Sequence, residues 1–177
     1  MRILDLFSGI GGFSLAASWV WPDLEIVGFC EIDPFCQKLL KKNFPGVPIY
    51  GDIRQVKGQP VELVTGGFPC QPFSVAGKRR GAADDRFLWP EMLRITEKTH
   101  PRWVLAENVP GIDDEQMVLD RVLTDLEGIG YEGWPFEIPA CAVNAKHRRN
   151  RVWVVAHSES GRGSGKPGGV CQETGKQ

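Results

Sequence analysis

The sequence lacks several features that would place it in other protein classes. It has no run of 18 apolar residues and no signal-peptide layout at residues 1–7, so we expect neither a membrane span nor secretion. Its five cysteines are an odd number at irregular spacing with no CxxC pair, which argues against a metal site and a disulfide framework. The formal net charge of −1 excludes a uniformly basic nucleic-acid coat. These absences fit a protein of the reduced cytosol.

The sequence does contain strand-like apolar runs that alternate with helical patterns. Strands are predicted at residues 3–7, 26–30, 49–50, 61–65, 103–106, 136–138 and 152–156. Helices are predicted at residues 13–21, 34–44, 88–98 and 115–126, with Asp33 as N-cap of the second. This order predicts an α/β fold, three-layer α/β/α, with a mostly parallel sheet. Residues 1–157 form the predicted domain, and residues 158–177, with six glycines, a predicted flexible tail.

A glycine-rich turn, "DLFSGIGG", follows the first predicted strand and opens the first helix. Alone it is equally well explained as a tight structural turn, because it is not the GxGxxG fingerprint. Glu31 lies 20 residues past Gly11 at the end of the second strand, where a carboxylate can bind a ribose diol. Asp52 ends the third strand in the same way. Each carboxylate alone is more often a solvated loop residue, but the set favours an adenosine-containing cofactor.

Cys70 lies in the stretch "GGFPCQPFS", where Pro69 and Pro72 make the backbone stiff and irregular. A buried, inert thiol is the commonest role of cysteine and fits Cys30 or Cys36 better. Glu107, in "ENVPG", ends the next predicted strand, so it and Cys70 can face one cleft. A thiol with a carboxyl group nearby is a pair suited to covalent catalysis.

Two basic clusters flank this candidate site. Arg149 and Arg151 alternate in "KHRRNRVWVVAH", so in a strand both side chains would point to one face. The second cluster, residues 78–80, follows Cys70 closely. Such runs are usually solvated, but their position beside a nucleophile better suits phosphate contacts.

Taken in order, "DLFSGIGGFS", "GGFPCQPFS", "ENVPG" and "HRRNRVWVV" resemble the cytosine-C5 DNA methyltransferases, which use S-adenosylmethionine. "DDRFLWPE" looks like the fifth motif of that family, and the resemblance covers about residues 1–156. It implies a Rossmann-like methyltransferase domain, methylation of DNA in a restriction-modification setting, and a cytoplasmic, nucleoid-associated protein of bacterial or phage type.

The resemblance also implies roles for individual residues. Those implied to bind the cofactor are Phe7, Gly9 and Gly11 along its methionine and adenosine side, Glu31 at the ribose hydroxyls, Asp52 at the adenine amine, Ile32 and Ile53 beside the ring, and Leu88 at the rim. Those implied to be catalytic are Cys70, which adds to C6 of a flipped cytosine, Glu107 at N3, and Arg149 and Arg151, which steady the base.

The sequence departs from the family pattern in two places. His147 stands where many members have glutamine. We find no target-recognition region and no asparagine-containing final motif after residue 156, so we expect a split subunit, a truncated frame or a remnant, and a possible C-terminal partner chain. Two other readings remain open: an RNA cytosine-C5 methyltransferase, and an inactive module that only binds the cofactor.

Overall fold

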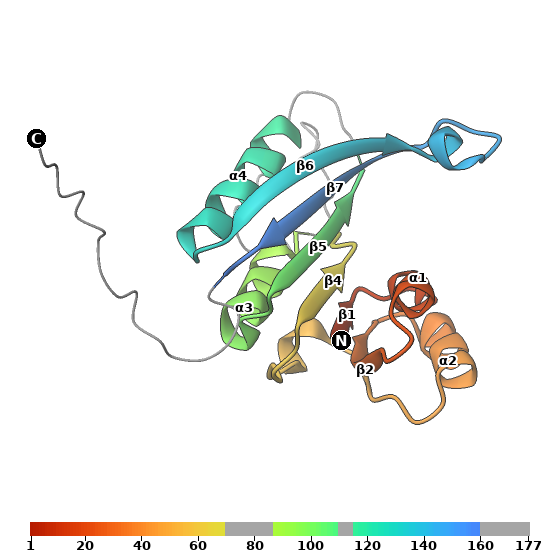
Figure 1. The fold of residues 1–177 in the computed structure, drawn as a ribbon. Helices are drawn as coiled ribbons and strands as arrows, with labels where there is room; N and C mark the ends of the chain where they lie inside the picture. Colours follow the sequence, from red (N-terminus) through yellow and green to blue (C-terminus); the bar gives the residue numbers. More distant parts are fainter. Residues whose placement is uncertain (70–86, 110–114, 160–177) are drawn as a thin grey trace, which may run out of the picture.

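A computed structural model describes residues 1–69, 87–109 and 115–159 of the chain (Figure 1). Its strands are β1 (Arg2–Leu6), β2 (Glu25–Cys30), β3 (Ile49–Tyr50), β4 (Leu63–Gly66), β5 (Trp103–Asn108), β6 (Glu132–Pro139) and β7 (Asn150–His157). They form one sheet in the order β3-β2-β1-β4-β5-β7-β6. β1 to β5 pair in parallel, and β7 runs antiparallel to both β5 and β6. The predicted α/β fold with a mostly parallel sheet is confirmed.

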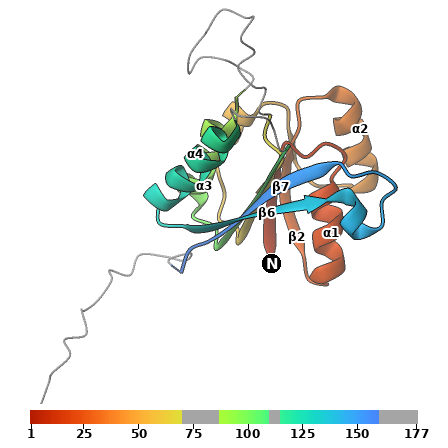
Figure 2. The same ribbon diagram turned by 90° about the horizontal axis from the view of Figure 1, so that it is seen from above.

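Helices lie on both faces of the sheet, as the alternating pattern predicts (Figure 2). One face carries α1 (Gly12–Val20) and α2 (Pro34–Asn43), and the other carries α3 (Trp89–Thr99) and α4 (Glu115–Gly128). Two short 3-10 helices, η1 (Ile53–Gln55) and η2 (Ala140–Val143), complete the described elements. The predicted cap of α2 is confirmed, because the Asp33 carboxylate accepts hydrogen bonds from the backbone N–H groups of Phe35 and Cys36.

The larger hydrophobic core lies between the sheet and the α3/α4 layer. Leu4, Val64 and Val104 point into it from the neighbouring strands β1, β4 and β5, because residues paired in register lie on the same face of a sheet. Trp89 and Met92 of α3 are fully buried against them. A smaller cluster of Ile3, Ala17 and Leu63 lies on the α1 face. Burial therefore differs strongly between the two faces of one sheet.

Two local features differ from the sequence prediction. β6 is longer than the predicted strand at residues 136–138, although it contains Pro135. Proline is tolerated there because β6 is an edge strand, where a missing N–H group breaks no ladder. Arg149 precedes β7 in a left-handed conformation with φ of 34°, so the prediction that Arg149 and Arg151 alternate within one strand is wrong.

No helix in residues 1–69, 87–109 and 115–159 is long and apolar enough to cross a membrane. The predicted tail lies outside the described residues from residue 160 onwards, and so do residues 78–80 of the second basic cluster.

Candidate active site

The carboxyl ends of the parallel strands bring the predicted site residues to one edge of the sheet. Phe7, Glu31 and Asp52 follow β1, β2 and β3, and Glu107 lies near the end of β5. β7 runs in the opposite direction, so Arg151 near its start reaches the same edge. The edge is where ligands of open α/β sheets bind. Cys70 is predicted to lie there too, but it falls outside the described residues.

The turn between β1 and α1 is built from left-handed backbone conformations. Phe7, Gly9 and Gly11 have φ angles of 52°, 53° and 88°. A Cβ atom at Gly11 would lie 2.6 Å from Cε2 of Phe44, at the end of α2, so glycine lets the turn pack closely on that helix. Phe7 has no such freedom, and strained non-glycine residues cluster at functional sites.

Glu31 fixes this turn to the start of α2. One carboxylate oxygen accepts a hydrogen bond of 2.7 Å from the backbone N–H of Gly9, and the other accepts one of 2.8 Å from Asp33. The Glu31 carbonyl also accepts a hydrogen bond from the side-chain amide of Gln37. Each carboxylate oxygen keeps a second acceptor site. Glu31 is therefore held rigidly while it can still accept hydrogen bonds from a ligand.

Asp52 and its neighbours differ widely in exposure. The Asp52 carboxylate caps η1, because it accepts a hydrogen bond of 2.9 Å from the backbone N–H of Arg54. Ile53 is only 5% exposed, whereas Ile32 is 78% exposed. Leu88 is half-buried at the start of α3, and its N–H donates to the Pro69 carbonyl. Of the two isoleucines, Ile32 therefore has the accessible side chain.

Glu107 and Arg151 form an ion pair at the β5–β7 end of the edge. The distance between Oε1 of Glu107 and Nε of Arg151 is 2.7 Å, and both side chains are largely shielded from water. A Cβ atom at Gly67 would lie 3.0 Å from Oε2 of Glu107, so the segment that leads to Cys70 passes close to this carboxylate. Arg149 is exposed just before the strand. The structure thus brings Arg151, but not Arg149, into contact with Glu107.

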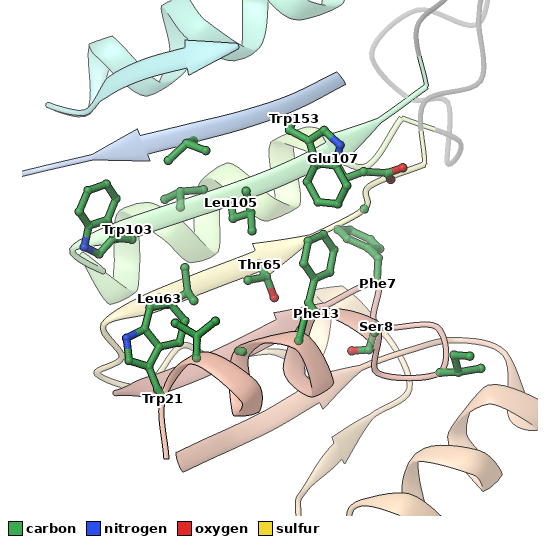
Figure 3. A pocket seen from close by; sticks show the side chains of 18 residues that line it. Phe7, Ser8, Phe13, Trp21, Leu63, Thr65, Trp103, Leu105, Glu107 and Trp153 are labelled. Carbon is green, nitrogen blue, oxygen red and sulfur yellow. The ribbon is translucent and has the colours of Figure 1, made fainter. Parts of the chain in front are cut away.

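A cavity of about 690 Å³ opens beside these residues, between α1 and strands β4, β5 and β7 (Figure 3). Its volume is in the range of small-molecule sites, and most of its lining is apolar. Phe7 and Ser8 border it on the side of the glycine turn, and Glu107 and Trp153 on the side of the ion pair. The cavity therefore connects the turn with Glu107.

Asp5 is a buried part of the site that the sequence analysis did not identify. It lies inside β1, and its carboxylate accepts hydrogen bonds from the Ser14 N–H, the Ser14 hydroxyl and the Thr65 hydroxyl at 3.2, 2.8 and 3.2 Å. Burial raises the pKa of Asp5 to about 7, although the hydrogen bonds from Ser14 and Thr65 lower it. Asp5 supplies the cap that Gly11 cannot, so it ties α1 to β1 and β4.

The part of the chain that the structure describes holds no group of three or more His, Cys, Asp or Glu side chains that could bind a metal ion.

The chain matches the family model described as C-5 cytosine-specific DNA methylase over residues 1–167. It is 36% identical over 165 residues to the Type II methyltransferase M2.BsuMI of Bacillus subtilis (strain 168), covering 88% of this chain and 42% of that protein. It is 32% identical over 160 residues to the Type II methyltransferase M.NlaX of Neisseria lactamica, covering 87% of this chain and 51% of that protein. The chain therefore spans about half or less of these relatives.

Solved structures agree with this match. A DNMT2 mutant of Spodoptera frugiperda superposes with a TM-score of 0.74 at 26% identity, covering 90% of this chain and 50% of that chain. The S. pombe Dnmt2 methyltransferase has a TM-score of 0.75 at 24% identity, covering 93% and 52%, which shows a shared fold.

Proposed function

Because the chain belongs to the C-5 cytosine-specific DNA methylase family, we propose that it transfers a methyl group from S-adenosylmethionine to C5 of cytosine in DNA. The observation that carries the proposal is the Glu107–Arg151 ion pair at the same sheet edge as the Glu31-anchored turn. The segment that leads to Cys70 passes beside Glu107 at Gly67. A nucleophile, a carboxyl group and a cofactor site would then share one edge.

The described residues fit S-adenosylmethionine, which when bound would supply a methyl group on a sulfonium sulfur. Glu31 has free acceptor sites for the two ribose hydroxyls, and Asp52 is the partner for the adenine amine. The exposed Ile32 side chain can cover the adenine ring, and Ile53, which is buried directly after Asp52 in the chain, is the second proposed neighbour of the ring. The remaining proposed cofactor contacts are the turn residues Phe7, Gly9 and Gly11, and Leu88 at the rim.

The chemistry assigns a separate task to each catalytic residue. The Cys70 thiolate bonds to C6 of the cytosine, which moves the C5–C6 π electrons to C5 while Glu107 engages N3. C5 would then take the methyl group as the bond between that methyl group and the sulfonium sulfur breaks, which leaves a neutral thioether. Loss of the C5 proton and of the C6–sulfur bond restores the double bond and the thiolate. Arg151 orients the Glu107 carboxylate, and Arg149 contacts the base, which must be flipped out of the duplex to be reached.

Sequence recognition is proposed to come from polypeptide equivalent to the rest of the longer relatives, either in the same chain or in a partner chain. The motivation is the coverage of 42% and 51% of M2.BsuMI and M.NlaX. The described residues offer only a few cations near the site, and such contacts give weak, salt-sensitive association.

Transfer of a radiolabelled methyl group to DNA and to RNA tests the proposal. The chain should be assayed alone and with the C-terminal part of a relative such as M.NlaX, and the product hydrolysed to identify 5-methylcytosine. We expect label in DNA, and a loss of about a hundredfold or more in Glu107→Gln. Glu127→Gln, an exposed change on α4, is the control.

Each other outcome has a distinct meaning. Label in RNA but not in DNA would replace the proposal with the RNA alternative. Cofactor binding without transfer to either polymer, under both conditions, would favour a binding module. If the protein neither binds the cofactor nor transfers a methyl group, the proposed function is refuted altogether.

A further inference from the structure

Arg94, in the middle of α3, joins that helix to η1. Its Nη1 donates a hydrogen bond of 3.2 Å to the Val56 carbonyl, and its Nη2 donates one of 3.1 Å to the Ile53 carbonyl. Its Nε donates to the Glu91 carboxylate at 2.8 Å, within the first turn of the same helix. The Arg94 side chain is largely shielded from water, which strengthens these contacts. One planar guanidinium therefore holds two carbonyls of η1, while an ion pair on α3 fixes its own orientation.

A three-residue 3-10 helix such as η1 holds its own shape weakly. Its backbone is closed by hydrogen bonds from the N–H of Gln55 to the Asp52 carbonyl and from the N–H of Val56 to the Ile53 carbonyl, at 3.0 and 3.2 Å. Hydrogen-bond geometry in such short turns is poor. The buried side chains of Ile53 and Val56 also anchor η1, but apolar contacts are non-directional. Arg94, which is 41 residues from Ile53 in the chain, adds directional contacts.

The orientation of η1 determines where the Asp52 carboxylate lies. Asp52 is the N-cap of η1, because its Oδ1 accepts a hydrogen bond of 2.9 Å from the N–H of Arg54. The Asp52 side chain is 36% exposed, so it remains accessible to a ligand. The helix α3, by contrast, is fixed in the core by its buried side chains. Arg94 therefore extends the rigidity of α3 to the turn that carries Asp52.

We propose that Arg94 is a positioning residue for cofactor binding: by holding η1, it keeps the Asp52 carboxylate where it can accept a hydrogen bond from the adenine amine. The inference rests on the proposed function, which gives Asp52 this partner. Leu88, the N-cap of α3, has its proposed place at the rim of the same pocket, so Arg94 also links the helix of Leu88 to the turn of Asp52. Glu31, just after β2, is held by other backbone N–H groups. Loss of Arg94 should therefore impair recognition of the adenine amine and leave recognition of the ribose intact.

Calorimetry with two cofactors tests this role. Arg94→Met keeps a long side chain and removes its donors, and the 6-deamino analogue of S-adenosylmethionine has hydrogen in place of the adenine amine. We expect Arg94→Met to weaken S-adenosylmethionine binding by about tenfold, because a hydrogen bond to a charged group is weakened, and to change binding of the analogue by less than about twofold. In the Asp52→Ala background, Arg94→Met should cause no further loss, because the contact that Arg94 positions is already gone.

Arg2→Met is the matched control. The Arg2 side chain also bridges a carboxylate, that of Glu25, and a carbonyl, that of Pro60, but it lies at the start of β1, at the opposite edge of the sheet. Arg2→Met should leave the affinity for both cofactors within about twofold, since it removes comparable contacts far from η1. A loss as large as that in Arg94→Met would show that a general loss of rigidity lowers binding, and it would overturn the inference.

The other outcomes are equally distinct. Equal weakening for both cofactors, no weakening for either, or additive losses in the double variant would each overturn the inference. If the unaltered protein binds the two cofactors equally well, Asp52 makes no contact with the amine, and the inference fails although cofactor binding stands. Failure of the unaltered protein to bind either cofactor would refute the proposed function, and this inference with it.

Arg94→Lys covers the case in which Arg94→Met does not fold. Lysine keeps the positive charge beside Glu91 but lacks the planar fork that reaches both carbonyls of η1. We expect a smaller loss of affinity, about threefold, with S-adenosylmethionine and none with the analogue. An equal response to the two cofactors would overturn the inference.

Discussion

The two faces of the sheet are built from the same strands but differ in how completely their side chains are buried. On the α3/α4 face, the residues of β1, β4 and β5 meet fully buried side chains such as Trp89 and Ile95 in a continuous core. On the α1/α2 face, the described residues form a small buried cluster of Ile3, Ala17 and Leu63, and Phe29 packs against Phe44 after α2. The part of that face over β4, β5 and β7 borders the cavity. One face stabilises the domain, while the other leaves a cavity beside the proposed site.

Alternation along each strand produces this division. In β4, Val64 and Gly66 point to the core, whereas Leu63 and Thr65 line the cavity. In β5, Val104 and Ala106 are buried in the core, and Glu107 faces the other way. A rigid core can therefore position the site from behind without filling it.

The largest expected effect is on the core face. Trp89 is fully buried, and its indole N–H donates to the Asp125 carboxylate at 2.9 Å. Trp89→Ala should lower the free energy of unfolding by about 3–5 kcal/mol, measured by urea denaturation. Trp134→Ala on β6, where the side chain is 41% exposed on the cavity face, should cost less than about 1.5 kcal/mol. Similar losses of unfolding free energy in both variants would show that the two faces contribute equally to stability.

A second prediction concerns binding on the open face. Glu31→Ala removes the proposed acceptor for the ribose and the anchor of the Gly9 turn. It should weaken S-adenosylmethionine binding by about ten- to a hundredfold, which corresponds to roughly 1.5–3 kcal/mol, as measured by calorimetry. Glu25→Ala, at the opposite end of the same strand, should bind normally. Unchanged affinity in Glu31→Ala would exclude Glu31 as a ligand.

A third prediction compares two glycines of the turn between β1 and α1, which differ in how closely they pack against α2. Gly9 and Gly11 both have left-handed φ angles, but only Gly11 packs against Phe44 and Leu40. Gly11→Ala should therefore lower the free energy of unfolding by about 1–2 kcal/mol more than Gly9→Ala, since it adds overpacking to the same backbone strain. Thermal or urea unfolding of the two variants measures the difference. Equal losses of unfolding free energy would show that Phe44 and Leu40 move aside without cost.

A last prediction is a pH dependence of stability that comes from Asp5. Its folded-state pKa of about 7 exceeds the usual 3.8, so the folded protein holds a proton that the unfolded chain releases. The resulting stabilisation is complete below about pH 4 and is lost as the pH rises to about 7. The slope of the unfolding free energy against pH should become shallower in Asp5→Asn, by up to about 1.4 kcal/mol per pH unit in this window. Parallel stability curves for the two proteins would contradict the assignment.

Much of this arrangement could be predicted from the sequence. Apolar runs of strand length predicted the strands, and Asp33 followed by Pro34 predicted the start of α2. Since parallel strands end at one edge, Glu31, Asp52 and Glu107 could be placed together before any coordinates were known.

The remaining features depend on contacts between distant segments. The burial of Asp5 involves Thr65, which is 60 residues away, and Trp153 lies opposite Glu107 only because of the β5–β7 register. The left-handed backbone of Arg149 reflects how the chain enters β7, and the local sequence pattern does not encode that.

Covalent trapping tests the central proposal, that Cys70 is the nucleophile for cytosine-C5 methyl transfer. DNA that contains 5-fluorocytosine has no removable proton at C5, so elimination cannot finish and the adduct should persist on a denaturing gel. With S-adenosylmethionine, and with the C-terminal part of a relative where needed, the account predicts an adduct with the unaltered chain and none with Cys70→Ala. Cys141→Ala and Cys171→Ala should trap like the unaltered chain. An adduct that survives Cys70→Ala would contradict the account.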